Sequence, residues 1–64
     1  MKRNLLIKHL QSNGCVFLRE GKKHSIYKNP ANNKLAAVPR HADIKDLMAK
    51  EICSELGVPK VGSN

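Results

Sequence analysis

The sequence has few of the features that mark secreted or membrane-spanning proteins. It contains only two cysteines, Cys15 and Cys53, whereas disulfide-dense secreted domains carry more. No signal peptide is visible, because Lys2 and Arg3 precede only a short apolar run. No apolar stretch approaches the ~20 residues that a helix needs to span a bilayer. We therefore expect a cytoplasmic protein with two free thiols and no membrane contact.

Several common catalytic and ligand-binding motifs are also missing. The three histidines form no HxH or HExxH pattern, and the cysteines form no CxxC pair. No serine has the surroundings of a nucleophile elbow, and no glycine-rich phosphate loop is present. The sequence thus predicts no metal site and no cofactor.

Acidic residues are scarce relative to basic ones. The 64-residue chain has 12 Lys or Arg and 5 Asp or Glu, which gives a formal net charge of +7. Such an excess favours a polyanionic partner, with nucleic acid first and an anionic membrane second. A membrane-binding protein would concentrate these residues on one amphipathic helix, whereas here they are spread along the chain. The simplest alternative is a basic surface that only keeps the protein soluble.

Hydrophobic patterns and turn residues predict one small domain, residues 1–64, with a thin core. The expected elements are a helix over 3–12, strands over 15–19, 24–28 and 34–38, and a final helix that ends at Leu56. The fold class is therefore α+β, in the order α-β-β-β-α, with a three-stranded antiparallel sheet that carries both helices on one face. Residues 58–64 are expected to form a loose, flexible tail.

The last helix has clear sequence signals at both ends. Asp43 is a good N-cap, Asp46 lies near the positive end of the helix dipole, and Gly57 ends the helix. Apolar residues at helical spacing predict one buried stripe. This stripe consists of Ile44, Leu47, Met48, Ile52 and Leu56.

The alternation of the second strand determines which residues face the helices. Ser25 and Tyr27 point one way, and His24, Ile26 and Lys28 point the other. Burying His24 together with Lys28 costs more than exposing Ile26, so we expect Tyr27 to face inward. Ile26 then lies on the open face of the sheet, and an apolar group on this basic surface indicates a protein partner. Val16 and Leu18 are expected on the same face.

Three segments together resemble the HicA family of toxins. They are Gly21 to Pro30 (GKKHSIYKNP), the segment Val38-Pro39-Arg40-His41, and the helix that ends at Leu56-Gly57. The resemblance covers residues 3–58. HicA toxins are small mRNA interferases of bacterial and archaeal toxin–antitoxin pairs, with a fold like that of a double-stranded-RNA-binding domain. Many members have one residue between the glycine and the histidine, whereas two lysines intervene here.

The resemblance implies a metal-independent RNA-cleaving toxin that is silenced by a HicB-like antitoxin and meets DNA only through it. The family's catalytic histidine falls on His24, as general base or acid. RNA carries its own nucleophile, the 2′-hydroxyl, and histidine exchanges protons readily near neutral pH. The alternative for His24 is a hairpin histidine that merely tolerates exposure.

Basic residues around His24 are suited to hold phosphate and to offset charge in the transition state. The predicted RNA-binding residues are Lys22, Lys23, Lys28, Arg40 and His41. His41 is equally well placed to cap the turn before the last helix. The predicted antitoxin-binding residues are His24, Ile26 and Lys28.

Two other functions compete with the toxin hypothesis. A non-catalytic double-stranded-RNA-binding module has the same order of elements, but it needs lysines at the start of its second helix. Here Asp43 and Asp46 stand at that start, with only Lys45 between them. A pure protein-interaction module is compatible with the open apolar residues, but it leaves the net charge unexplained.

Overall fold

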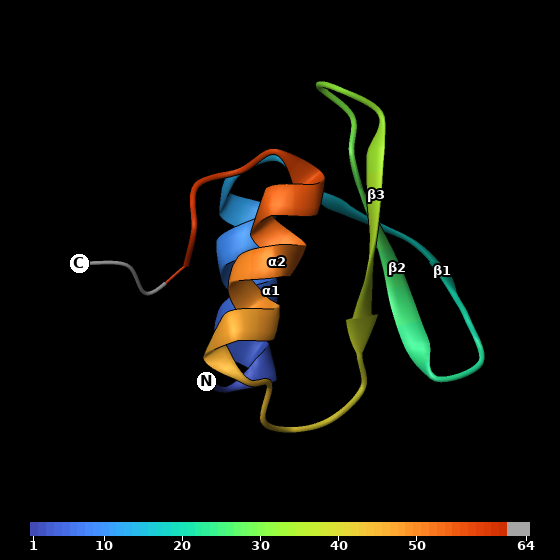
Figure 1. Cartoon of the computed structure of the whole chain (residues 1–64). Helices are drawn as coiled ribbons and strands as arrows, with labels where there is room; N and C mark the ends of the chain where they lie inside the picture. Colours follow the sequence, from blue (N-terminus) through green and yellow to red (C-terminus); the bar gives the residue numbers. More distant parts are fainter. Residues whose placement is uncertain (62–64) are drawn as a thin grey trace.

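The computed structural model describes residues 1–61 and confirms the predicted α-β-β-β-α order (Figure 1). The elements are α1 (Arg3–Ser12), β1 (Val16–Glu20), β2 (His24–Asn29), β3 (Lys34–Pro39) and α2 (Asp46–Leu56). The strands form one antiparallel sheet in the order β1-β2-β3. This is the layout of a double-stranded-RNA-binding domain. Neither α1 nor α2 has the length and apolar character of a membrane-spanning helix.

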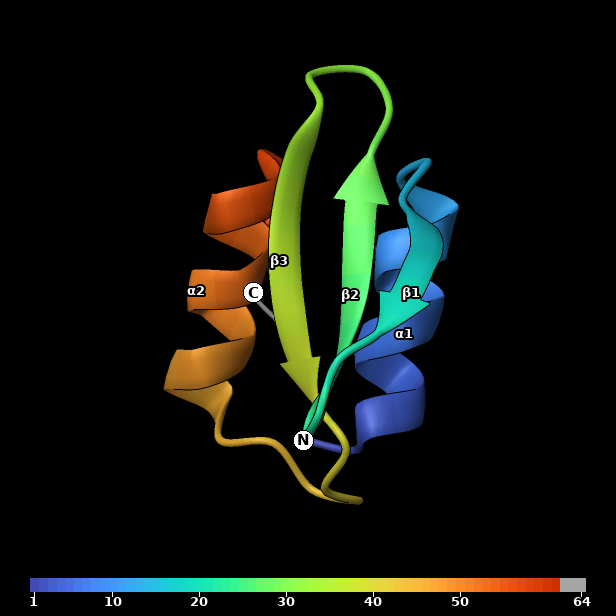
Figure 2. The same cartoon turned by 90° about the vertical axis from the view of Figure 1, so that its right-hand side faces the viewer.

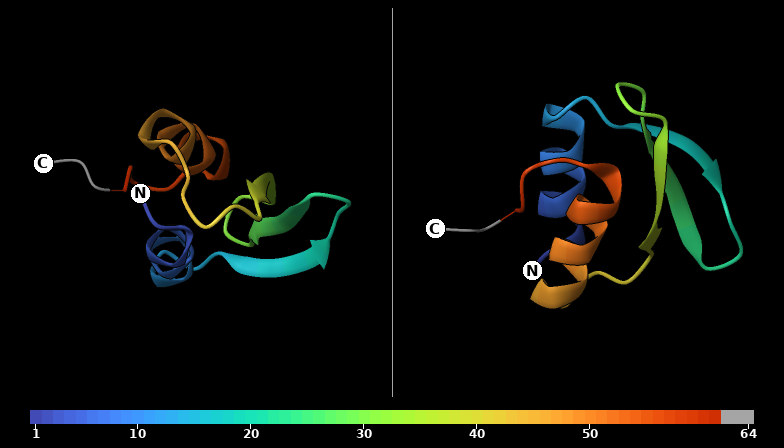
Figure 3. Two further views of the ribbon diagram at one scale, coloured as in Figure 1. Left: turned by 90° about the horizontal axis from the view of Figure 1, so that it is seen from below. Right: turned by 45° about the horizontal axis from the view of Figure 1, so that its top comes forward.

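The sheet and the helices form two layers. Seen onto the sheet in Figure 2, α1 lies behind β1 and α2 lies behind β3, so both helices cover the same face. The end-on view in Figure 3 shows the helices on one side and the strands on the other. No other segment of residues 1–61 covers the second face of the sheet, which we call the open face.

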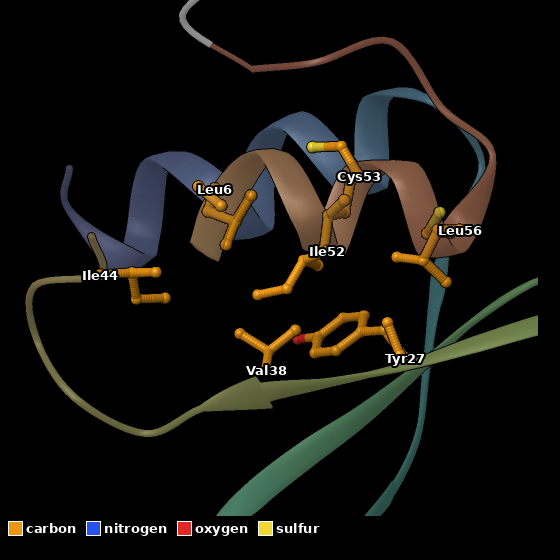
Figure 4. Close-up of a cluster of buried hydrophobic side chains, with 11 residues drawn as sticks. Leu6, Tyr27, Val38, Ile44, Ile52, Cys53 and Leu56 are labelled. Carbon is orange, nitrogen blue, oxygen red and sulfur yellow. The ribbon is translucent and has the colours of Figure 1, made fainter. Parts of the chain in front are cut away.

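The core lies between these layers and is built from a small number of side chains. Tyr27 and Val38 extend from the sheet toward Leu6, Ile52 and Leu56 on the helices (Figure 4). Each large apolar side chain that is fully buried contributes about 1.5–3 kcal/mol. With so few of them, the fold depends on nearly every one.

The predicted alternation of β2 is confirmed. Ser25 and Tyr27 are only 2% and 7% exposed and face the helices. His24 is exposed on the open face, where Ile26 and Lys28 are half-buried. Across the sheet, Ile26 pairs with Ala37 of β3.

A β-bulge in β1 adds to the open face. Phe17 pairs with Tyr27 and contacts its ring edge-on at a centroid distance of 5.9 Å. The register then shifts, so that Arg19 pairs with Ile26 and Leu18 is the extra residue. In a bulge of this kind two residues oppose one partner, which places Leu18 beside Arg19 opposite Ile26.

The predicted start of the last helix was wrong. α2 begins at Asp46, and the residue at its N-cap position, Lys45, makes no side-chain capping bond. Asp43 instead lies in an extended segment that pairs with the N-terminus. The backbone N–H of Ile44 donates to the Met1 carbonyl at 2.8 Å. This hydrogen bond is made with the segment in an extended conformation. Asp46 occupies the first turn of the helix, as expected from its charge.

The predicted apolar stripe was therefore only partly right. Ile44, Ile52 and Leu56 are buried, but Met48 is 44% exposed and Leu47 is 71% exposed. Because Ile44 lies before the helix, its spacing to Met48 does not place the two on one helical face. The small residues Ala49 and Cys53 occupy the buried face instead.

The C-terminal end of α2 is held by the turn between β2 and β3. The side-chain amides of Asn29 and Asn32 both donate to the Leu56 carbonyl, at 2.8 and 3.1 Å. Gly57 follows with φ 71°, and a Cβ there would lie 2.6 Å from Asn32 Nδ2. The left-handed backbone therefore favours glycine here, and a larger residue would also force the Asn32 amide to shift.

Residues 58–64 are the segment for which the sequence predicted a loose tail. Val58 and Val61 pack against the core, and the Pro59 carbonyl lies 2.6 Å from His9 Nε2. The rest of the predicted tail, residues 62–64, lies outside the described residues.

Both cysteines are free thiols in the core. Burial raises the pKa of the Cys15 thiol, and the neighbouring Cys53 raises it further. Cys15 therefore stays protonated and unreactive at neutral pH, which fits a packing role.

Candidate functional site

His24 is the first residue of β2 and lies at one end of the open face. Its backbone pairs with Pro39 of β3, whereas its imidazole makes no hydrogen bond or ion pair with any of residues 1–61. The ring is thus exposed on a strand whose backbone is paired, which is the situation of a side chain available to an external group.

The turn before His24 brings two lysines to it. Lys22 and Lys23 form the exposed tip of the β1–β2 hairpin, and the Gly21 amide closes the turn by donating to the His24 carbonyl at 2.7 Å. A Cβ on Gly21 would lie 3.2 Å from that carbonyl oxygen, so a glycine suits this close approach. The structure accommodates both lysines within a closed turn.

Lys28 lies on the open face of the sheet, as His24 does, but it is not close to His24. It lies four residues further along β2, roughly 13 Å away at the usual rise of a strand. Lys22 and Lys23 therefore stand in the turn that leads into His24, whereas Lys28 lies at the far end of the open face.

Arg40 has a different environment from the one that its sequence context suggested. Its Nη1 forms an ion pair with Glu20 Oε1 at 3.1 Å, and its Nη2 donates to the Gly21 carbonyl at 3.1 Å and to the Lys22 carbonyl. A bidentate phosphate contact through these two nitrogens would require it to exchange its present partners.

Two shallow grooves run between the end of β3 and α2. The first, of about 220 Å³, is lined by His24 and by residues of β3 and α2. The second, of about 230 Å³, is lined by His41 and by the residues that precede α2. Pro39 and Met48 line both, so the grooves are neighbours with one histidine at each.

Sequence reasoning missed the contribution of α2 to this site. Glu51, Glu55 and the exposed Met48 line the groove beside His24. On the sequence these glutamates are indistinguishable from an ordinary solvated helix face, and only the packing of α2 beside β3 brings them to His24. Their charge makes the α2 side unfavourable for phosphate and the Lys22–Lys23 side favourable.

The open face also carries an apolar patch. Val16, Leu18 and Leu35 are 48%, 44% and 48% exposed. Val16 and Leu35 both pair with Lys28, and Leu18 lies in the bulge opposite Ile26. This apolar surface is therefore continuous with the half-buried Ile26 and reaches toward His24.

The titratable residues do not gather into a metal-binding cluster within residues 1–61. No group of three or more His, Cys, Asp or Glu side chains there has the geometry to hold an ion. The site that the structure does present consists of an exposed imidazole, two lysines, a groove and an apolar face.

Comparison with known proteins identifies the family of the chain. A family model described as the HicA toxin of bacterial toxin–antitoxin systems matches residues 4–58. Neither the curated proteins nor the solved structures with which the sequence was compared contain a match. The matched segment includes all of β1, β2, β3 and α2 and nearly all of α1. The chain therefore belongs to the HicA toxins of bacterial toxin–antitoxin systems.

Proposed function

We propose that this toxin is a metal-independent endoribonuclease that uses His24 as its general base. The observation that carries the proposal is the exposed imidazole of His24, which has no partner among residues 1–61 and lies beside the Lys22–Lys23 tip. An acid–base catalyst must reach the proton that it transfers, and a ring without internal partners is available to do so.

The reaction that fits these groups is an intramolecular transesterification of the RNA, in which the phosphoryl group moves from a 5′ oxygen to the neighbouring 2′ oxygen. His24 removes the proton from a ribose 2′-hydroxyl, and the oxygen attacks the adjacent phosphorus. The new P–O2′ bond forms as the P–O5′ bond breaks, and the departing 5′ oxygen takes up a proton from water. Lys22 and Lys23 offset the charge that accumulates on the phosphate oxygens.

The charges around His24 indicate how the RNA would lie. The phosphate belongs on the side of Lys22 and Lys23, because Glu51 and Glu55 flank the opposite side. The ribose and base would then point toward the groove lined by Pro39 and Met48. His41 lines the neighbouring groove and is proposed to contact the next part of the strand.

The partner of the toxin is proposed to be a HicB-like antitoxin that covers the open face. His24, Ile26 and Lys28 lie in line along β2 on this face, and Ile26 lies between the bulge of β1 that contains Leu18 and Ala37 of β3. A protein that is acidic at its rim and apolar at its centre fits this surface. Such a protein would inhibit by covering His24.

Cleavage of a single-stranded RNA by the purified toxin is expected to continue in excess EDTA. The reason is that the proposed step uses a side-chain base and lysines alone. The measurement is the rate of cleavage with EDTA and with added Mg²⁺ or Mn²⁺. If EDTA stops cleavage and the added ion restores it, the proposed mechanism is wrong. RNA binding without cleavage under every condition would instead favour the non-catalytic double-stranded-RNA-binding module.

The triple variant Lys22→Gln, Lys23→Gln, Lys28→Gln is expected to bind RNA more weakly and with a shallower salt dependence. Each phosphate contact on a single strand contributes about −0.7 to the slope of log affinity against log salt, so the slope should change by up to about 2. Lys8→Gln is the control, because Lys8 is an exposed lysine on α1, in the helical layer. An unchanged slope in the triple variant would place the RNA on another surface.

A further inference from the structure

A chain of polar contacts joins four side chains beneath the start of β2. Arg3, on α1, donates from Nε to the Pro39 carbonyl at 2.8 Å and from Nη2 to the Ser25 hydroxyl at 2.9 Å. The Ser25 hydroxyl lies 3.2 and 3.1 Å from the two carboxylate oxygens of Glu20, to which it donates. Glu20 in turn pairs with Arg40 at 3.1 Å. We call Arg3, Ser25, Glu20 and Arg40 the anchoring network.

The anchoring network contacts the backbone next to His24 at several points. Ser25 directly follows His24 in β2, and Pro39 is the partner of His24 across the sheet. Arg40 donates to the carbonyls of Gly21 and Lys22, in the turn that precedes His24. The side chain of His24 is left free while its backbone is held.

The network also fixes the parts of the site relative to one another. Arg3 connects α1 to the end of β3, and Pro39 lines both grooves. Arg40 connects the segment after β3 to the lysine tip. Ser25 is 2% exposed, so its hydroxyl is shielded from water, and charged partners strengthen the hydrogen bonds that it makes.

We propose that the anchoring network positions His24 and the Lys22–Lys23 tip for cleavage, and that Arg40 acts through this network rather than as a phosphate ligand. The inference rests on the proposed function, because it assigns a role in that reaction. A displacement of about 1 Å in a catalytic group is enough to cost about 10²-fold in rate. A hairpin tip with an exposed catalytic ring would otherwise be free to move by that amount.

Arg40→Lys separates the two roles of Arg40. Lysine keeps the positive charge, but it lacks the planar fork that joins Glu20 to the two turn carbonyls. A phosphate ligand that acts by charge would survive this change. A positioning residue would not, so we expect kcat to fall about 10–100-fold with KM within about twofold of wild type. Ser25→Ala should have the same effect, because it removes the link between Arg3 and Glu20.

Arg19→Lys is the matched control. It makes the same chemical change at an exposed position on β1, and the Arg19 side chain makes no hydrogen bond or ion pair with residues 1–61. We expect it to leave kcat, KM and thermal stability unchanged. Thermal unfolding of Arg40→Lys and Ser25→Ala, measured alongside, shows whether each variant is folded at the assay temperature.

Backbone ¹⁵N relaxation of the free toxin provides a readout that does not depend on RNA. The order parameters of Lys22, Lys23 and His24 should fall from the rigid value of about 0.85 toward 0.6 in Arg40→Lys, with those of α2 unchanged. Loss of order together with loss of kcat supports the inference. Loss of order with a normal kcat, or an unchanged order parameter, overturns it.

If the wild-type toxin does not cleave RNA at all, the proposed function fails and the catalytic role of the network fails with it. In that case the relaxation data still show whether the network keeps the turn before His24 rigid, because they do not depend on RNA cleavage.

Discussion

RNA cleavage by the His24→Ala variant is expected to fall by about 10²–10⁴-fold relative to the wild-type toxin, which is the usual contribution of a positioned general acid or base. Growth arrest by the expressed variant should disappear with it. The fold should persist, because the side chain is exposed and makes no hydrogen bond or ion pair with residues 1–61. The measurement is single-turnover cleavage after circular dichroism has confirmed an unchanged fold.

His9→Ala provides the comparison for this experiment. His9 lies on α1, in the helical layer, and its ring contacts the Pro59 carbonyl at 2.6 Å. It should cleave RNA at the wild-type rate, since α1 does not reach the open face. Undiminished cleavage by a folded His24→Ala variant contradicts the assignment of His24.

Binding of the antitoxin is expected to weaken at least about thirtyfold in the Ile26→Asp variant, with most RNA cleavage retained. Ile26 lies between His24 and Lys28 on the open face and adjoins the exposed apolar residues of β1 and β3. A truncated anchor at the centre of an interface often costs ≥ ~2 kcal/mol, and a carboxylate there also repels an acidic partner. The variant should therefore be toxic even when the antitoxin is co-expressed.

Leu47→Asp is the control for this prediction. Leu47 is 71% exposed on α2, which lies on the opposite face of the sheet from Ile26 (Figure 2). An inhibitor that covers the open face should bind Leu47→Asp and the wild-type toxin equally well. If folded Ile26→Asp also binds normally, the antitoxin occupies another surface and inhibition by covering His24 is wrong.

Local patterns in the sequence were sufficient to predict the fold. The alternation of β2 follows from the cost of burying His24 with Lys28, and Tyr27 accordingly faces the helices at 7% exposure. Gly57 ends α2 in the left-handed conformation that glycine favours. Both predictions depend on residues that are close in the sequence.

The errors arose where distant segments meet. Asp43 has the sequence character of an N-cap, but its segment pairs with the N-terminus and delays the helix to Asp46. Met48 has the spacing of a core residue, yet it lies at the groove beside His24. No local pattern reports either contact.

The same limit applies to the site. Arg40 follows Pro39 in the sequence, but its ion pair with Glu20 becomes visible only when the hairpin folds back on β3. Arg3 precedes Ser25 by most of α1 and all of β1, so nothing in the sequence links it to His24. The exposure of His24 was therefore predictable, whereas the contacts of Arg3 and Arg40 around it were not.

The role proposed for His24 is to remove a proton from the 2′-hydroxyl of the RNA itself. The most direct test is cleavage, in EDTA, of an RNA strand and of the same strand with one 2′-deoxy nucleotide immediately 5′ to the mapped cut. The expected result is that the wild-type toxin cuts the RNA at that position and leaves the 2′-deoxy strand intact there, while His24→Ala cuts neither. Cleavage of the 2′-deoxy strand at the same position, or normal cutting of the RNA by folded His24→Ala, would contradict this role of His24.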